Sequence, residues 1–158
     1  MLALALALPG GRPPLLPTGI PSSGVASWYG HRCPEGVTVL DRSNTCTPYR
    51  SKADGGKGGE LWYYAAVGVW RYGQKPYRIR VCRADDATRC VVVWVRDYCA
   101  RCAKDLVRTW TPKSRAIDLS PKAFASLAGL GRGVLAVTIR LVPSSSDSLL
   151  TRLPRDWK

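Results

Sequence analysis

The stretch VVVWVRDYCARC, residues 91–102, decides more about the fold than any other segment of this chain. A valine stands at every second position from 91 to 95, and this alternation predicts a strand with one buried face. Asp97 ends the strand, and continued alternation places it on the inward side with the three valines. A carboxyl group on an inward face is either partnered or poised as a general acid, because apolar surroundings raise its pKa.

The segments around this stretch repeat the period of two. Residues 77–82 and 135–141 alternate in the same way, and a further short strand is expected at Val25–Tyr29. Cys82 is on the outward face of its strand, and Cys90 starts the next strand in the outward phase, after a connection of residues 83–89. A hairpin would bring both sulfurs to one face near its loop, so we predict a Cys82–Cys90 disulfide.

The chain contains six cysteines, an even count that is typical of a disulfide framework in an oxidising compartment. Besides Cys82–Cys90, the other four allow three connectivities, of which Cys99–Cys102 with Cys33–Cys46 is the local one. Zinc is the competing interpretation of Cys99-x-x-Cys102. A structural zinc site usually pairs two such motifs, and the only histidine is His31. We therefore predict no metal and no cofactor.

Asp118 lies two residues before the one helix that the sequence predicts. Ser120 is suited to the N-cap, Pro121 to the first helical position and Gly129 to the end of the helix. Spacing alone leaves two interpretations of Asp118 open. It is either an acid of a functional site or an acceptor that fixes the helix start or a loop.

Length and composition limit the organisation and the partners. The 158 residues suffice for one domain, and a hydrophobic fraction of 46% permits a packed core. Residues 1–23 are expected to be a leader or linker, whose apolar run at 2–8 is too short to span a bilayer and suits part of a signal peptide. Residues 24–142 form the expected domain and 143–158 a tail. The net charge of +13 favours an anionic partner: nucleic acid, an anionic membrane or an acidic cell-wall polymer.

Several motifs together resemble one family. Residues 91–102, the run AIDLSPKAFASL at 116–127 and the strand at 133–142 look like the second half of a double-psi β-barrel, and GVASWYG at 24–30 resembles its start. The resemblance is to rare lipoprotein A and to bacterial and fungal expansin-like proteins, and more distantly to barwin. It covers about residues 24–142. It implies a mainly β fold, a six-stranded double-psi β-barrel with one short α-helix, stapled by disulfides, with an open polysaccharide groove.

The same resemblance implies a site. The essential acid of expansin-like proteins corresponds to Asp118, the aspartate ending the preceding strand to Asp97, and the small hydroxyl residue of the first strand to Ser27. We expect Asp118 and Asp97 to lie close together as the catalytic pair, with Ser27, Tyr29 and Tyr98 contacting substrate. Some aromatic rings are expected at the groove rim, while most pack in a small barrel; the candidates are Trp62, Tyr63, Tyr64, Trp70, Tyr72 and Trp110.

Two departures from the family pattern bear on activity. The first-strand neighbourhood, residues 27–31, lacks the second carboxylate that barrel-type endoglucanases use, which disfavours two-carboxylate hydrolysis. Rare lipoprotein A proteins usually carry a histidine after an Ala-Ala pair, whereas this chain has Ala65-Ala66-Val67. A lytic transglycosylase-like reaction needs only one acid/base carboxylate and stays open.

These observations favour a secreted or extracytoplasmic, monomeric domain that acts on a cell-wall polysaccharide, either peptidoglycan or an associated anionic polymer. The alternatives are cleavage of the glycan and non-catalytic wall loosening or carbohydrate binding, as in expansins. Nucleic acid is not expected as a partner, since no recognised nucleic-acid motif occurs. No membrane span is expected either.

Overall fold

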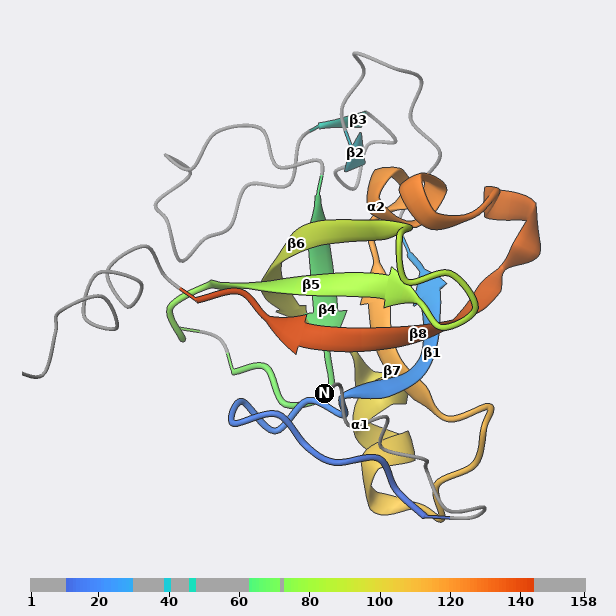
Figure 1. Ribbon diagram of the computed structural model, residues 1–158. Coiled ribbons are helices and arrows are strands. Elements are labelled where there is room, and N and C mark those ends of the chain that lie inside the picture. Colours follow the sequence, from blue (N-terminus) through green and yellow to red (C-terminus); the bar gives the residue numbers. More distant parts are fainter. Residues whose placement is uncertain (1–10, 30–38, 41–45, 48–62, 72, 144–158) are drawn as a thin grey trace, which may run out of the picture.

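Six strands form a closed barrel in the order β1-β7-β4-β6-β5-β8 (Figure 1). The computed structural model describes residues 11–29, 39–40, 46–47, 63–71 and 73–143. The barrel strands are β1 (Ser23–Trp28), β4 (Tyr64–Val67), β5 (Tyr77–Arg83), β6 (Cys90–Tyr98), β7 (Arg115–Leu119) and β8 (Val134–Leu141). A separate antiparallel pair is formed by β2 (Val39–Leu40) and β3 (Cys46–Thr47). The predicted six-stranded barrel is therefore confirmed.

The three long strands β5, β6 and β8 follow the alternation of the sequence. Their inward side chains are buried and form much of one hydrophobic core: Ile79, Val81, Val91, Val93, Val95, Leu135, Val137 and Ile139. The polar or exposed residues between them face outward. Burial of one face thus explains why the sequence pattern predicted these strands.

The β5–β6 hairpin carries the predicted disulfide. Cys82 pairs with Cys90 in the antiparallel register, and the Cα atoms of the two residues are 4.0 Å apart. A second disulfide joins Cys99 to Cys102, as the local option proposed. Cys33 and the side chain of Cys46 lie outside the described residues.

Two strands of the barrel, β4 and β7, were not predicted as strands from the residues. All four residues of β4 are buried, and β7 is largely buried, because helices also cover these two strands. Such strands show no alternation of apolar and polar residues. The helix α1 (Ala100–Val107) packs on β7, and α2 (Pro121–Leu127) packs on β6.

The expectation of one helix was wrong, since α1 and α2 are both α-helices and a 3₁₀ turn follows at Leu130–Arg132. α2 begins as predicted: the Ser120 hydroxyl oxygen accepts a hydrogen bond from the Ala123 amide, with Pro121 next to the cap. α1 was missed because its N-cap is Cys99, whose sulfur accepts from the Cys102 amide. A cysteine is not among the residues that signal a helix start.

The described part of the leader contacts the barrel. Ile20 is fully buried in the hydrophobic core, and Leu15 forms an isolated bridge with Pro21. Within the described ranges, no helix has the length and apolar character needed to cross a membrane.

Candidate functional site

The strand register places four residues in one row across β1, β7, β4 and β6. Ser27 pairs with Asp118 between the parallel strands β1 and β7. Asp118 pairs with Ala66 on β4, and Ala66 pairs with Asp97 on β6. Because neighbouring strands lie about 4.8 Å apart, the backbones of the two aspartates are separated by roughly 10 Å, with Ala66 between them.

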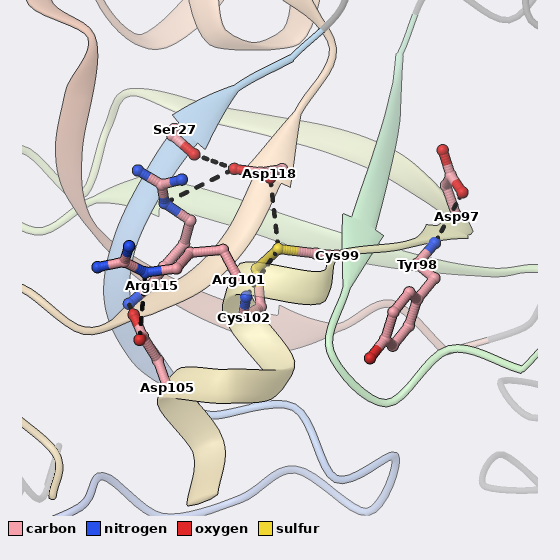
Figure 2. The surroundings of a disulfide bond; sticks show 9 residues. All are labelled: Ser27, Asp97, Tyr98, Cys99, Arg101, Cys102, Asp105, Arg115 and Asp118. Carbon is pink, nitrogen blue, oxygen red and sulfur yellow. Dashed lines mark hydrogen bonds and ion pairs between the residues drawn. A yellow bond between two sulfur atoms is a disulfide. The ribbon is translucent and has the colours of Figure 1, made fainter. Parts of the chain in front are cut away.

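Three groups surround the Asp118 carboxyl group (Figure 2). The Ser27 hydroxyl donates a hydrogen bond to Oδ1, and Arg115 Nε lies 3.8 Å from the same oxygen. Cys99 Sγ lies 3.3 Å from Oδ2. A disulfide sulfur has no hydrogen to donate, so it can only accept. Both donors therefore converge on Oδ1, and Oδ2 is the oxygen suited to carry a proton.

Burial raises the pKa of Asp118 above its ordinary value of 3.8, while the nearby Arg115 guanidinium opposes this effect. The side chain is 17% exposed, so it is shielded but reachable. Burial is thus the main cause of the raised pKa of Asp118.

Asp97 differs from its predicted position on the inward face. Ala65 pairs with Val95 and Ala66 with Asp97, so Arg96 is an extra residue on β6 and forms a bulge. Val95 and Arg96 are both buried, and Asp97 is half-buried. The bulge interrupts the alternation one residue before Asp97, which sequence periodicity cannot reveal.

Tyr29 links Asp97 to the surroundings of Asp118. Its hydroxyl donates to Asp97 Oδ2 at 3.2 Å, and its ring packs against a small cluster of Ala66, Cys99 and Cys102. Its ring also meets the ring of Tyr64 edge-on, with centroids 5.7 Å apart. Burial first, and the charge of Asp97 second, raise the pKa of Tyr64 to about 12, so it stays neutral.

Tyr98 is the most exposed of the predicted site residues. Its side chain leaves the end of β6 and its residue is 44% exposed. The Tyr98 amide donates to Asp97 Oδ1 at 2.8 Å, which fixes the carboxylate at the strand end (Figure 2).

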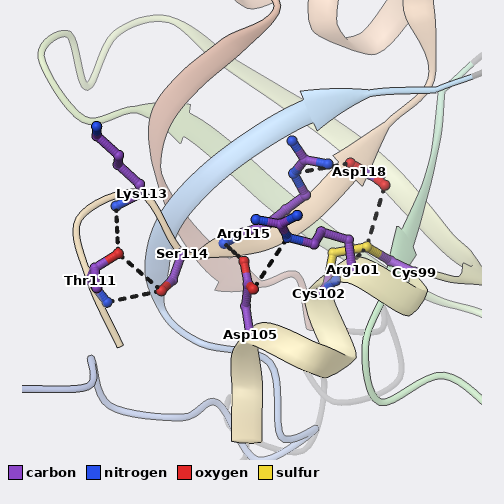
Figure 3. A network of polar contacts seen from close by, with 9 residues as sticks. All are labelled: Cys99, Arg101, Cys102, Asp105, Thr111, Lys113, Ser114, Arg115 and Asp118. Carbon is purple, nitrogen blue, oxygen red and sulfur yellow. Dashed lines mark hydrogen bonds and ion pairs between the residues drawn. A yellow bond between two sulfur atoms is a disulfide. The ribbon is translucent and has the colours of Figure 1, made fainter. Parts of the chain in front are cut away.

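A buried carboxylate supports the site from α1 (Figure 3). Asp105 Oδ2 accepts a hydrogen bond of 2.8 Å from the Arg115 amide, and Arg101 Nε lies 3.3 Å from Oδ1. These contacts anchor the start of β7, and with it Arg115, to α1. Sequence reasoning missed Arg101, Asp105 and Arg115. The spacing of four between Arg101 and Asp105 on a helix was the only signal for them.

The described residues offer one group of potential metal donors, formed by Cys99, Cys102 and Asp118, whose ligand atoms lie within 4.8 Å of one another. The disulfide occupies both sulfurs, so neither is a thiolate that could bind a metal ion. Among the rim candidates, Tyr64 and Trp70 are buried in the barrel, whereas Tyr63 is exposed. Trp62 and Tyr72 lie outside the described residues.

The raised pKa of Asp118 predicts a pH dependence of stability. Between the ordinary pKa and the raised one, the folded protein holds a proton that the unfolded chain has released. The contribution of this group is therefore complete below the ordinary pKa and is lost as the pH rises through the folded pKa. An Asp118→Asn variant should lack this loss and gain stability relative to wild type as the pH rises above about 4.

Urea denaturation of both proteins from about pH 3 to 8 measures this difference. A difference in unfolding free energy that is constant over the range would show that Asp118 titrates alike in the folded and unfolded states.

A family described as "Lytic transglycolase" matches residues 65–139, which include β4, Asp97, the Cys99–Cys102 disulfide and Asp118. No curated protein matches the chain.

Solved structures that match the chain include an expansin from Clavibacter michiganensis in complex with cellohexaose. It is 15% identical, has a TM-score of 0.41 and covers 78% of this chain and 52% of its own. The ligand-free expansin from the same organism is 16% identical, with a TM-score of 0.40 and coverages of 78% and 50%. The chain thus spans about half the length of these two proteins.

Proposed function

Because the chain belongs to the double-psi β-barrel family of rare lipoprotein A and expansin-like proteins, domains related to cell-wall polysaccharides, we propose that it binds and cleaves the glycan strands of peptidoglycan. The proposed reaction is lytic, with Asp118 as the acid and base. The two disulfides support an extracytoplasmic location, where such a substrate is found.

The observation that carries this proposal is the environment of Asp118. Its carboxyl group is shielded and has a raised pKa, and the donors that reach it from the described residues both lie at Oδ1. Oδ2 is left to hold a proton beside an acceptor sulfur. A general acid needs this combination of a retained proton and a fixed orientation.

One carboxyl group is sufficient for a lytic reaction. Asp118 gives its proton to the glycosidic oxygen as the bond from that oxygen to C1 breaks. The C6 hydroxyl of the same sugar then attacks C1 and returns its proton to Asp118. The products are a strand with a new hydroxyl and a strand ending in an anhydro-sugar, and no water is consumed. We assign Asp97 and Tyr29 the positioning of substrate, with Ser27 orienting Asp118 and the exposed Tyr98 contacting a neighbouring sugar.

One observation favours the second candidate, glycan binding without cleavage. The Arg115 guanidinium faces Oδ1 of Asp118 and stabilises its ionised form, which cannot act as an acid. In that case the row of residues around Asp118 and Asp97 would bind glycan, and the protein would loosen wall material without breaking bonds.

Incubation with purified sacculi tests the proposal. We expect soluble fragments with anhydro ends, identified by mass spectrometry, at a rate that depends on protein concentration. Binding to sacculi without any soluble fragment would support the non-catalytic alternative, and absence of binding would overturn both.

A further inference from the structure

The outer face of β6, β5 and β8 carries a group of arginines. It is separate from the row of Ser27, Asp118, Ala66 and Asp97, which we call the aspartate row. These three strands run side by side in Figure 1. The register places Arg80 of β5 between Arg140 of β8 and Val92 of β6. Arg78, two residues earlier on β5, pairs with Trp94 on β6. All three arginines are exposed, so the face presents them together to solvent.

Two of these arginines oppose each other directly. In an antiparallel pair, residues in register have Cβ atoms about 4.5–5.5 Å apart, and like charges at this distance are destabilising. The ion pairs formed among the described residues involve other arginines, namely Arg83, Arg101 and Arg115. Among the described residues, Arg80 and Arg140 therefore have no acidic partner that would offset their repulsion.

An aromatic ring extends the cationic surface towards β6. The guanidinium groups of Arg78 and Arg96 each lie 5.6 Å from the centre of the Trp94 ring, within the range of a cation–π interaction. This contact restrains Arg78 beside Arg80. Val92, 38% exposed, adds an apolar patch next to them. The face thus combines fixed cations with flat and apolar surface.

We propose that this arginine face, defined by Arg78, Arg80, Arg140 and Trp94, binds an acidic polysaccharide through its carboxylate groups. Guanidinium groups bind carboxylates through paired hydrogen bonds, and a chain of carboxylates would offset the repulsion between Arg80 and Arg140. The inference rests on the proposed function in taking a wall polysaccharide as the polymer. It adds a second surface that holds the protein on acidic wall material. The aspartate row, which carries carboxylates of its own, acts on a different glycan chain.

The presence of disulfides favours a polysaccharide over nucleic acid as the anionic partner. Oxidised cysteines lie on this same face at the end of the β5–β6 hairpin, where Cys82 pairs with Cys90. Disulfides are typical of oxidising compartments outside the cytoplasm, and we therefore choose a wall polysaccharide rather than nucleic acid as the partner.

Binding of polygalacturonate, measured by titration calorimetry at increasing salt, tests the proposal. The double variant Arg80→Gln/Arg140→Gln should bind about tenfold more weakly than wild type at low salt, and the difference should shrink as salt screens the charges. Its Tm should not fall and is expected to rise, because the variant removes a repulsive cross-strand pair. Weaker binding by a protein that is at least as stable separates recognition from misfolding.

The matched control is Arg71→Gln/Lys113→Gln, which removes the same charge from two exposed residues outside this face. It should bind polygalacturonate nearly as wild type does. Equal weakening in both double variants, or none in either, would overturn the assignment of the face. Binding of fully methyl-esterified polygalacturonate as tight as that of the acidic polymer would overturn the role of carboxylates. Tighter binding of a single-stranded oligothymidylate than of polygalacturonate would overturn the choice of partner.

This assay requires no turnover, so it stays informative if the lytic proposal fails. Conversely, release of fragments from sacculi together with absent polygalacturonate binding would reject the arginine face alone.

Discussion

An Asp118→Asn variant should release glycan fragments from sacculi about 10²–10⁴ times more slowly than wild type. Asparagine keeps the size of the side chain, and its oxygen can still accept the hydrogen bond of the Ser27 hydroxyl. Its amide can face Cys99 Sγ in the place of Oδ2. What the variant lacks is a transferable proton, so the rate falls while the barrel persists.

The control for this experiment is Asp85→Asn, which changes an exposed aspartate in the β5–β6 loop. It should release fragments at the wild-type rate, and the circular dichroism spectra of both variants should match that of wild type. An Asp118→Asn protein that is folded and fully active would remove Asp118 from the reaction. One that is unfolded would assign Asp118 a structural role instead.

A Gly68→Ala substitution should destabilise the protein, because an added Cβ meets its closest contact at this position among the described glycines. Gly68 follows the end of β4 and touches the backbone of α1. An added Cβ would lie 2.5 Å from the Ala103 nitrogen and 2.8 Å from the Ala103 Cα and the Cys102 carbonyl carbon. These are main-chain atoms of a helix, which cannot rotate away. Relief requires displacement of α1, and overpacking of this kind costs about 1–3 kcal/mol.

The displacement would also affect the site, because α1 contains Cys102 and is capped by Cys99, which lies beside Asp118. Denaturant unfolding measures the loss, with Gly131→Ala as the matched control. A Cβ on Gly131 meets nothing within 4 Å, so that variant should be nearly neutral. Equal stabilities of the two alanine variants would contradict the tight contact between β4 and α1.

The sequence predicted the parts of the fold in which one face meets water. The alternation in β5, β6 and β8 arises because these strands bury one face, and the Cys82–Cys90 disulfide followed from their phase. β4 is buried on both sides and contains no alternation to detect. The bulge at Arg96 shifts the phase of β6, so Asp97 does not have the inward orientation that was expected. The sequence around Arg96 gives no sign of this bulge.

The residues proposed for the candidate site came from the family resemblance, whereas the contacts among them could not be read from the sequence. The family resemblance identified Ser27, Asp97 and Asp118, but their common row depends on pairing between β1, β7, β4 and β6, which are distant in sequence. The groups that tune Asp118 were also missed. Arg115 acts from the same strand, and Cys99 acts as a disulfide sulfur that no motif marks as an acceptor.

The most direct test of the central claim is the fate of solvent oxygen during cleavage. Sacculi are incubated with the protein in water enriched in heavy oxygen, and the new chain ends are analysed by mass spectrometry. The lytic mechanism through Asp118 predicts anhydro ends that contain no solvent oxygen, because the C6 hydroxyl closes the ring. Reducing ends labelled with heavy oxygen would show hydrolysis by a water molecule and would contradict this account.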